Sequence, residues 1–187
     1  AATVFNGGFA SNAASTITTA DNTDTLTLIS TDADAAVGPN LNLYRNSSSP
    51  ANNDLIGNIA YNFTNDNSQS VAGFSINATA RNVVDGSENV KAIFETFSSG
   101  TSKNRFMIDT SETVFNEDSV DVDFRVESNG NANMLFVDGG ENRVGIGMNT
   151  PADTLHVKST GDPSGDIRLI LETNATDGNC AIDFRNS

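Results

Sequence analysis

The sequence has little of the chemistry from which active sites are usually built. It holds one cysteine, one histidine and no tryptophan among its 187 residues. A single cysteine excludes an intrachain disulfide and a cysteine-rich metal site. The histidine, His156, would have to be the base of any nucleophilic triad. It lies between Leu155 and Val157 in an alternating stretch, and we interpret it as an outward-facing strand residue.

Basic residues are also scarce. Ten Lys and Arg residues oppose 24 Asp and Glu residues, which gives a net charge of −14. A phosphate backbone or an anionic lipid surface would repel such a chain, so we expect no nucleic-acid partner. No apolar run approaches the roughly 18 residues that a bilayer requires, so we expect no membrane insertion. The simplest interpretation of the acidity is solubility and resistance to non-specific association.

Paired carboxylates are the remaining material for catalysis. If residues 120–126 form a strand, Asp121 and Asp123 lie about 7 Å apart on one of its faces. Glycosidases can use such a separation, but any acidic strand shows it. The chain has two tyrosines and no tryptophan, and is therefore poor in the aromatic platforms that sugar-binding surfaces favour. We predict that the protein is not an enzyme and has no catalytic residues.

Two oxygen-rich loops could attract a hard cation such as calcium. Asp32 and Asp34 precede Gly38, and residues 116–118 lead to Asp121. Neither stretch has the twelve-residue spacing of the helix–loop–helix calcium site. We interpret these carboxylates as solvated loop residues, and predict no bound metal and no cofactor.

What the chain does contain is apolar residues in alternation. In residues 120–126 every second side chain is apolar and those between are mostly charged, which predicts a strand with one buried and one wet face. The same period marks residues 26–28, 41–43, 59–63, 74–78, 90–94 and 106–108, and further strands are expected at 134–137, 143–146, 154–158, 167–171 and 181–185. No helical period is evident, and Asn-, Gly-, Ser- and Asp-rich turns recur throughout. We predict an all-β fold of short antiparallel strands that form a β-sandwich-like domain.

Two pairs of segments echo one another. Residues 41–47 and 181–187 share their pattern and both end in Arg-Asn-Ser, and residues 26–28 parallel residues 169–171. Chance similarity among short strands is one explanation. The other is a module of roughly 140 residues whose second copy is beginning where the sequence stops. The absence of an initiator Met likewise leads us to expect a portion of a longer protein.

The C-terminal third carries the most distinctive segment. An apolar strand leads through Gly139-Gly140-Glu141-Asn142 into Arg143-Val144-Gly145-Ile146-Gly147, and then through Pro151 to Leu155-His156-Val157. This arrangement resembles the strand–turn–strand segment that recurs in phage tail fibres and related virion appendages. The resemblance is carried best by residues 120–158. Similar segments occur in bacterial surface adhesins and in proteins that end in a self-cleaving chaperone domain, but no such domain lies within this sequence.

The resemblance implies a parallel homotrimer that acts as a shaft or spacer in a phage appendage and is located in the virion. Other tail or fibre proteins would be its partners, and another segment would contact a host receptor. In that arrangement Val144, Ile146, Leu155 and Val157 would face the three-fold axis, and Gly145 and Gly147 would let the chains approach closely. A bacterial cell-surface or secreted adhesin, a capsid-attached fibre and a polysaccharide-degrading tailspike are the alternatives.

The sequence thus divides into four expected parts. They are a tether or lead-in strand (1–20), a β-sandwich-like domain (21–128), a glycine-containing shaft or hairpin segment (129–158) and the start of a second β module (159–187).

Overall fold

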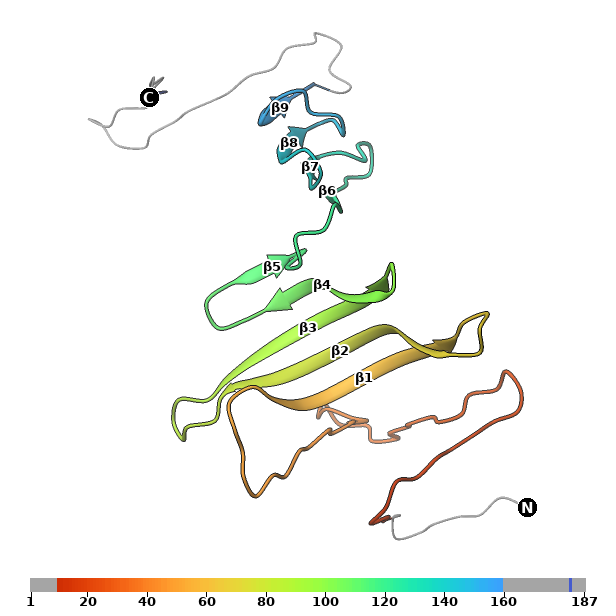
Figure 1. Cartoon of the computed structure of the whole chain (residues 1–187). Coiled ribbons are helices and arrows are strands. Elements are labelled where there is room, and N and C mark those ends of the chain that lie inside the picture. Colours follow the sequence, from red (N-terminus) through yellow and green to blue (C-terminus); the bar gives the residue numbers. More distant parts are fainter. Residues whose placement is uncertain (1–9, 160–181, 183–187) are drawn as a thin grey trace. The chain divides into compact units, whose positions relative to one another are not determined.

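The computed structural model describes residues 10–159 and residue 182. The chain divides into two units, Ala1–Leu43 and Tyr44–Ser187, and each is described by itself. All strands of the described residues lie in the second unit, where they form two sheets (Figure 1). The described residues contain no helix, and therefore none that could cross a membrane. The predicted all-β class is confirmed.

The first sheet has five antiparallel strands in sequence order. They are β1 (Asp54–Thr64), β2 (Ser70–Asn82), β3 (Asn89–Ser98), β4 (Thr101–Ile108) and β5 (Thr113–Phe115). Each strand pairs with the next one along the chain, as in a meander. The tightest connection joins β3 to β4 through Ser99 and Gly100, whose φ angles are 51° and 80°. Positive φ at both central residues matches the right-handed twist of the two strands, which explains why a glycine stands there.

Alternation gives the first sheet one face of aromatic and aliphatic side chains and an opposite face on which polar side chains predominate. Residues in direct register on neighbouring strands point to the same side. Tyr61 is in register with Phe74, and Phe106 with both Phe94 and Phe115, so these rings share one face. On the other face, named here the polar face, Ser75 is in register with Glu95, and Asn58 with Asn77. This face also carries the buried Ile93 and Met107, which are in register with each other.

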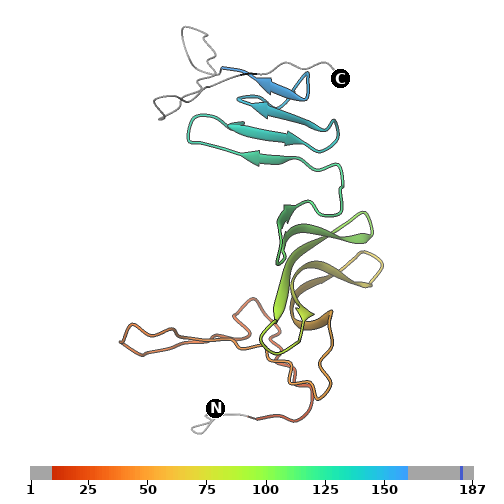
Figure 2. The ribbon, with the colours of Figure 1, turned by 90° about the vertical axis from the view of Figure 1, so that its left-hand side faces the viewer.

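The second sheet has four short strands. They are β6 (Phe124–Val126), β7 (Leu135–Asp138), β8 (Arg143–Ile146) and β9 (Leu155–Val157), side by side in that order (Figure 2). The first two pairs are antiparallel, but β8 and β9 are parallel, which the sequence analysis did not predict. A parallel pair needs a connection that carries the chain back to the end from which it came. Residues 147–154 provide it, and Arg143 Nη1 donates to the carbonyl of Pro151 within this loop (3.0 Å).

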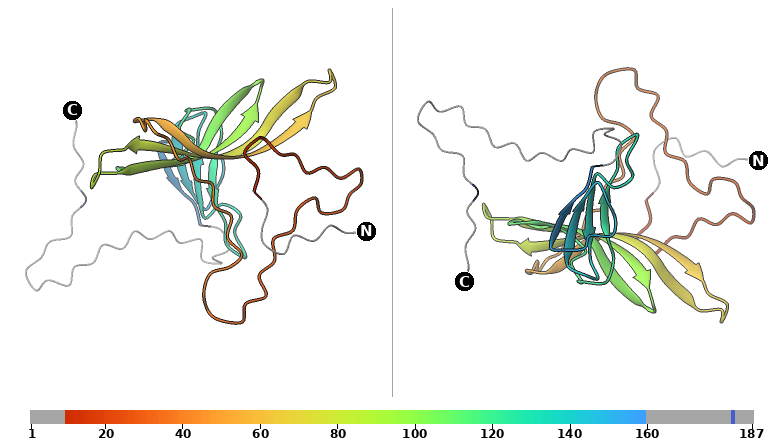
Figure 3. Two further views of the ribbon diagram at one scale, coloured as in Figure 1. Left: turned by 90° about the horizontal axis from the view of Figure 1, so that it is seen from below. Right: turned by 90° about the horizontal axis from the view of Figure 1, so that it is seen from above.

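Both sheets are single layers (Figures 2 and 3). Extensive contacts between strands are confined to hydrogen-bonded neighbours, so neither sheet packs face to face on the other. The buried hydrophobic side chains of the described residues are Ala80, Ile93, Met107 and Phe136, and none is less than 2% exposed. The described residues of one chain therefore do not form two packed sheets, and very few of their hydrophobic side chains are buried.

Several predicted strands differ from those observed. Residues 143–146 form a strand with the predicted bounds, and β7 and β9 match their predictions to within a residue at each end. Residues 26–28 and 41–43 are not strands, because no neighbouring strand pairs with them. The strand expected from residue 120 begins only at Phe124. The strands expected at 167–171 and 181–185 lie outside the described residues, as does most of the second copy of the internal echo.

Candidate assembly surface

One face of the second sheet is entirely apolar. It carries eight side chains, named here the aliphatic face: Phe124, Val126, Leu135, Val137, Val144, Ile146, Leu155 and Val157. The registers bring them together, since Val144 pairs with Val137 on one side and Leu155 on the other. Because alternate residues point to opposite sides, the residues between them face the other way; most of these are polar, but the buried Phe136 is among them.

The aliphatic face contains all four side chains that the sequence analysis assigned to the three-fold axis. Val144 and Ile146 come from β8, and Leu155 and Val157 from β9. In a single chain Ile146 is 42% exposed, Leu155 60% and Val157 39%. Whether they face a three-fold axis stays a prediction. What the structure establishes is that they form one continuous apolar surface that the described residues of one chain leave open.

The two glycines of this segment have a role within one chain. A Cβ atom at Gly145 would lie 2.5 Å from the carbonyl oxygen of Met148, where the loop after β8 folds back. Gly147 has a φ of 77°, which side chains other than glycine rarely adopt. The expectation that both glycines serve chain-to-chain approach stays a prediction, and the fold already requires them locally.

The opposite face of the second sheet is mainly polar, but the buried Phe136 lies on it, in register with Arg125 and Gly145. Arg143 lies 3.5 Å from Glu141, and Arg125 pairs with Glu127. His156 lies on this side in register with Gly145, and its Nδ1 accepts a hydrogen bond from the Ala152 amide (3.2 Å). In the part of the chain that the structure describes, neither a carboxylate nor a nucleophile is hydrogen-bonded to this ring, so the geometry contains no triad.

An unbroken series of aromatic rings crosses the first sheet and reaches the second. It consists of Tyr61, Phe74, Phe94, Phe106, Phe115 and Phe124, one from each of strands β1 to β6, and is named here the ring ladder. Successive ring centroids are 4.7–6.5 Å apart, a range in which tilted rings attract one another. The longest step joins Phe74 to Phe94, because these two residues are diagonal neighbours and not in direct register.

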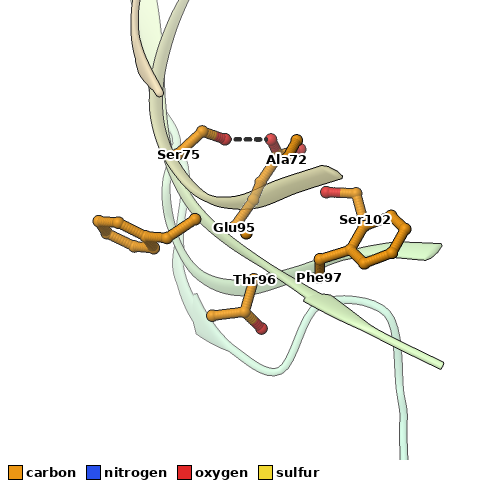
Figure 4. A pocket seen from close by; sticks show the side chains of 8 residues that line it. Ala72, Ser75, Glu95, Thr96, Phe97 and Ser102 are labelled. Carbon is orange, nitrogen blue, oxygen red and sulfur yellow. Dashed lines mark hydrogen bonds between the residues drawn. The ribbon is translucent and has the colours of Figure 1, made fainter. Parts of the chain in front are cut away.

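The polar face of the first sheet holds a small pocket. Its walls come from residues 72–75 of β2, residues 95–97 of β3, and Ser102 of β4 (Figure 4). The Glu95 carboxylate accepts hydrogen bonds from Ser75 Oγ (2.8 Å) and from Asn77 Nδ2. The pocket volume is about 50 Å³, far below that of typical ligand sites. Glu95 is the sole carboxylate in its lining, whereas glycoside hydrolysis needs two.

The other carboxylates singled out in the sequence serve the backbone. Asp123 accepts a hydrogen bond from the Gly139 amide (3.1 Å), and a Cβ at Gly140 would lie 2.7 Å from Asp121 Oδ1. Asp123 therefore supports the turn before β8, Asp121 lies beside that turn, and the two are not paired on a strand face as predicted. Asp32 and Asp34 accept from the amides two residues further on, and Asp118 accepts from the Asn104 amide. Within residues 10–159 no three His, Cys, Asp or Glu side chains are grouped so that they could hold a metal ion.

The sequence analysis missed half of the aliphatic face and the whole ring ladder. Phe124, Val126, Leu135 and Val137 lie in stretches whose alternation was noted, but their register with β8 was not inferred. The signal for the ladder was the recurrence of one phenylalanine in each of several successive strands. No protein-family model matches the chain, and no curated protein matches it.

Proposed function

We propose that this chain is a structural subunit of a phage virion appendage, a tail fibre, in which it serves as a shaft or spacer. Its role is mechanical: three identical chains form a stiff acidic rod that holds a binding tip away from the particle. The observation that carries the proposal is the aliphatic face, where five of the eight apolar side chains are exposed by 36–60% in the described part of one chain. The likeness of residues 120–158 to fibre segments supplies the class of protein.

Burial explains why such a chain would assemble. Exposed apolar area costs about 25 cal/mol per Å², and a single-layer sheet buries almost none of it on its open side. Identical copies cover one another's aliphatic faces around a common axis, and each copy contributes the same surface. The polar faces, with Glu95, Arg125 and Arg143, then point to solvent.

The proposal is tested first by mass. Light scattering after size-exclusion chromatography of the purified chain should give three times the chain mass of 19.6 kDa. A stable monomer at micromolar concentration would overturn the proposal, because the aliphatic face would then stay exposed to water without driving association.

The virion assignment is tested separately. An antibody against the chain should label appendages of phage particles recovered from the same source, as seen by electron microscopy with gold-conjugated secondary antibody. Labelling of bacterial cell walls in place of particles would support a surface adhesin and overturn the virion role. Release of reducing ends from host capsule by the purified chain would instead identify a tailspike enzyme.

A further inference from the structure

The ring ladder leaves a second apolar surface open, on the first sheet. Tyr61 and Phe115, the rings on its two edge strands, are 59% and 55% exposed. Flanking side chains on the same face are also exposed: Ile59 by 38%, Val90 by 50% and Ile108 by 45%. Contiguous apolar patches of this kind on soluble proteins usually mark an interaction surface.

Charge indicates what kind of partner would fit this face. Among the register pairs of the first sheet, Asp54 is the one carboxylate on the ladder side, and it is ion-paired with Arg45 (3.2 Å). Lys103 lies in register with Thr96 on this face, and the nearby Arg105 donates to Thr96 Oγ1. Neither cation forms an ion pair with any described residue.

A second copy of the chain matches the ring ladder in charge and in apolar surface. With a net charge of −14, like copies repel one another over most of their surface, but not across a face that lacks free carboxylates. An acidic partner can also pair with Lys103 and Arg105. Phe124 belongs to both the ring ladder and the aliphatic face, so the two apolar surfaces are continuous through it.

We propose that the ring ladder is a contact surface for a second copy of this chain, so that assembly covers the first sheet as well as the second. This inference rests on the proposed function, because it extends the same self-association to residues 59–115. Specific interfaces bury about 800 Å² per partner, and an aromatic side chain buries about 150–250 Å². The ladder adds area of this order to the aliphatic face.

The absence of tryptophan permits a clean optical test in the full chain. Phe115→Trp places a reporter on the ladder, where the native ring is 55% exposed and a larger ring fits. Phe97→Trp is the matched control, because Phe97 is 39% exposed but lies on the polar face beside Glu95. The emission maximum and the acrylamide quenching of each variant are measured at chain concentrations above and below the dissociation constant of the assembly.

In the assembled state the Phe115→Trp reporter should be blue-shifted and quenched several-fold less than the Phe97→Trp reporter. Dilution to the monomer should make the two reporters alike. A trimer in which both tryptophans are equally accessible, or equally shielded, overturns the inference about this face and leaves the proposed trimer intact. A monomeric mass at every accessible concentration overturns both.

Discussion

The two sheets differ in the side-chain contacts that support their open apolar faces. Each has one apolar face and an opposite, mainly polar face that also carries buried hydrophobic side chains (Ile93 and Met107 in the first sheet, Phe136 in the second), and neither covers its apolar face within the described part of one chain. The first sheet has long strands, with β2 spanning 13 residues, and its aromatic rings pack against one another across neighbouring strands. The second sheet has strands of three or four residues, so each side chain of its aliphatic face has few neighbours with which to pack.

The difference shows how strongly each sheet depends on assembly. Long strands and stacked rings give the first sheet internal contacts that survive without a partner. Short strands joined by glycine turns give the second sheet a defined shape, but little that holds it alone. We therefore expect self-association to stabilise the second sheet more than the first, and the following experiments test that contrast.

The largest effect should come from placing a charge on the aliphatic face. Leu155→Asp should weaken association by roughly 100-fold or more, because an unpaired charge in a dry interface costs about 3–5 kcal/mol. Val84→Asp is a matched control, since Leu155 and Val84 are both 60% exposed but Val84 lies in the loop between β2 and β3. Sedimentation velocity measures both, and equal dissociation by the two variants would contradict the assignment of the interface.

A smaller effect should follow from adding one methyl group at Gly145. Gly145→Ala should lower the free energy of unfolding by about 1–3 kcal/mol, because its Cβ collides with the Met148 carbonyl and the loop must shift. Gly130→Ala, where no atom lies within 4 Å of the new Cβ, is the control. Urea unfolding followed by circular dichroism gives both values.

The same glycine variant separates folding from assembly. If the role of Gly145 lies within one chain, the loss persists when Gly145→Ala is combined with Leu155→Asp, which is monomeric by design. If the glycine serves only close approach of chains, the loss disappears in that background. The second result would favour the expectation drawn from the sequence resemblance.

Hydrogen exchange should report the contrast between the sheets directly. On dilution below the dissociation constant of the assembly, amides of β8 and β9 should lose protection by roughly tenfold more than those of β2 and β3. The reason is that short strands open locally once the neighbouring chain has dissociated. Mass spectrometry of peptic peptides resolves the two regions, and equal loss in both sheets would show that the first sheet depends on assembly just as much.

The smallest effect concerns pH and the first sheet alone. The backbone amide of Thr110 and, to a lesser extent, Arg81 hold the pKa of Asp109 below its ordinary value of 3.8. A carboxyl with a lowered folded pKa contributes stability above the unfolded value, and loses it as pH falls through the folded pKa. The stability difference between the wild type and Asp109→Asn should stay constant from pH 7 to about 5 and shrink below about 3.8. A difference that instead shrinks near neutral pH would contradict this origin.

Local pattern predicted the class of fold well. Alternation located β7, β8 and β9 closely, because a strand with one wet face needs an apolar residue at every second position. The same rule failed at residues 26–28 and 41–43, which alternate but have no neighbouring strand. It also failed at residues 120–123, where Asp123 supports a turn instead. A strand exists only when another strand satisfies its amides, and that partner is not visible locally.

By itself, the sequence determined that apolar residues alternate along the strands, that turns separate these strands and that the chain has one histidine and one cysteine. The tertiary structure decided which strands are neighbours. It placed Val144 between Val137 and Leu155, made β9 parallel to β8, and aligned one ring from each of six strands. The reason is physical: side-chain alternation is a property of adjacent residues, whereas register joins residues far apart in the chain and depends on every turn between them.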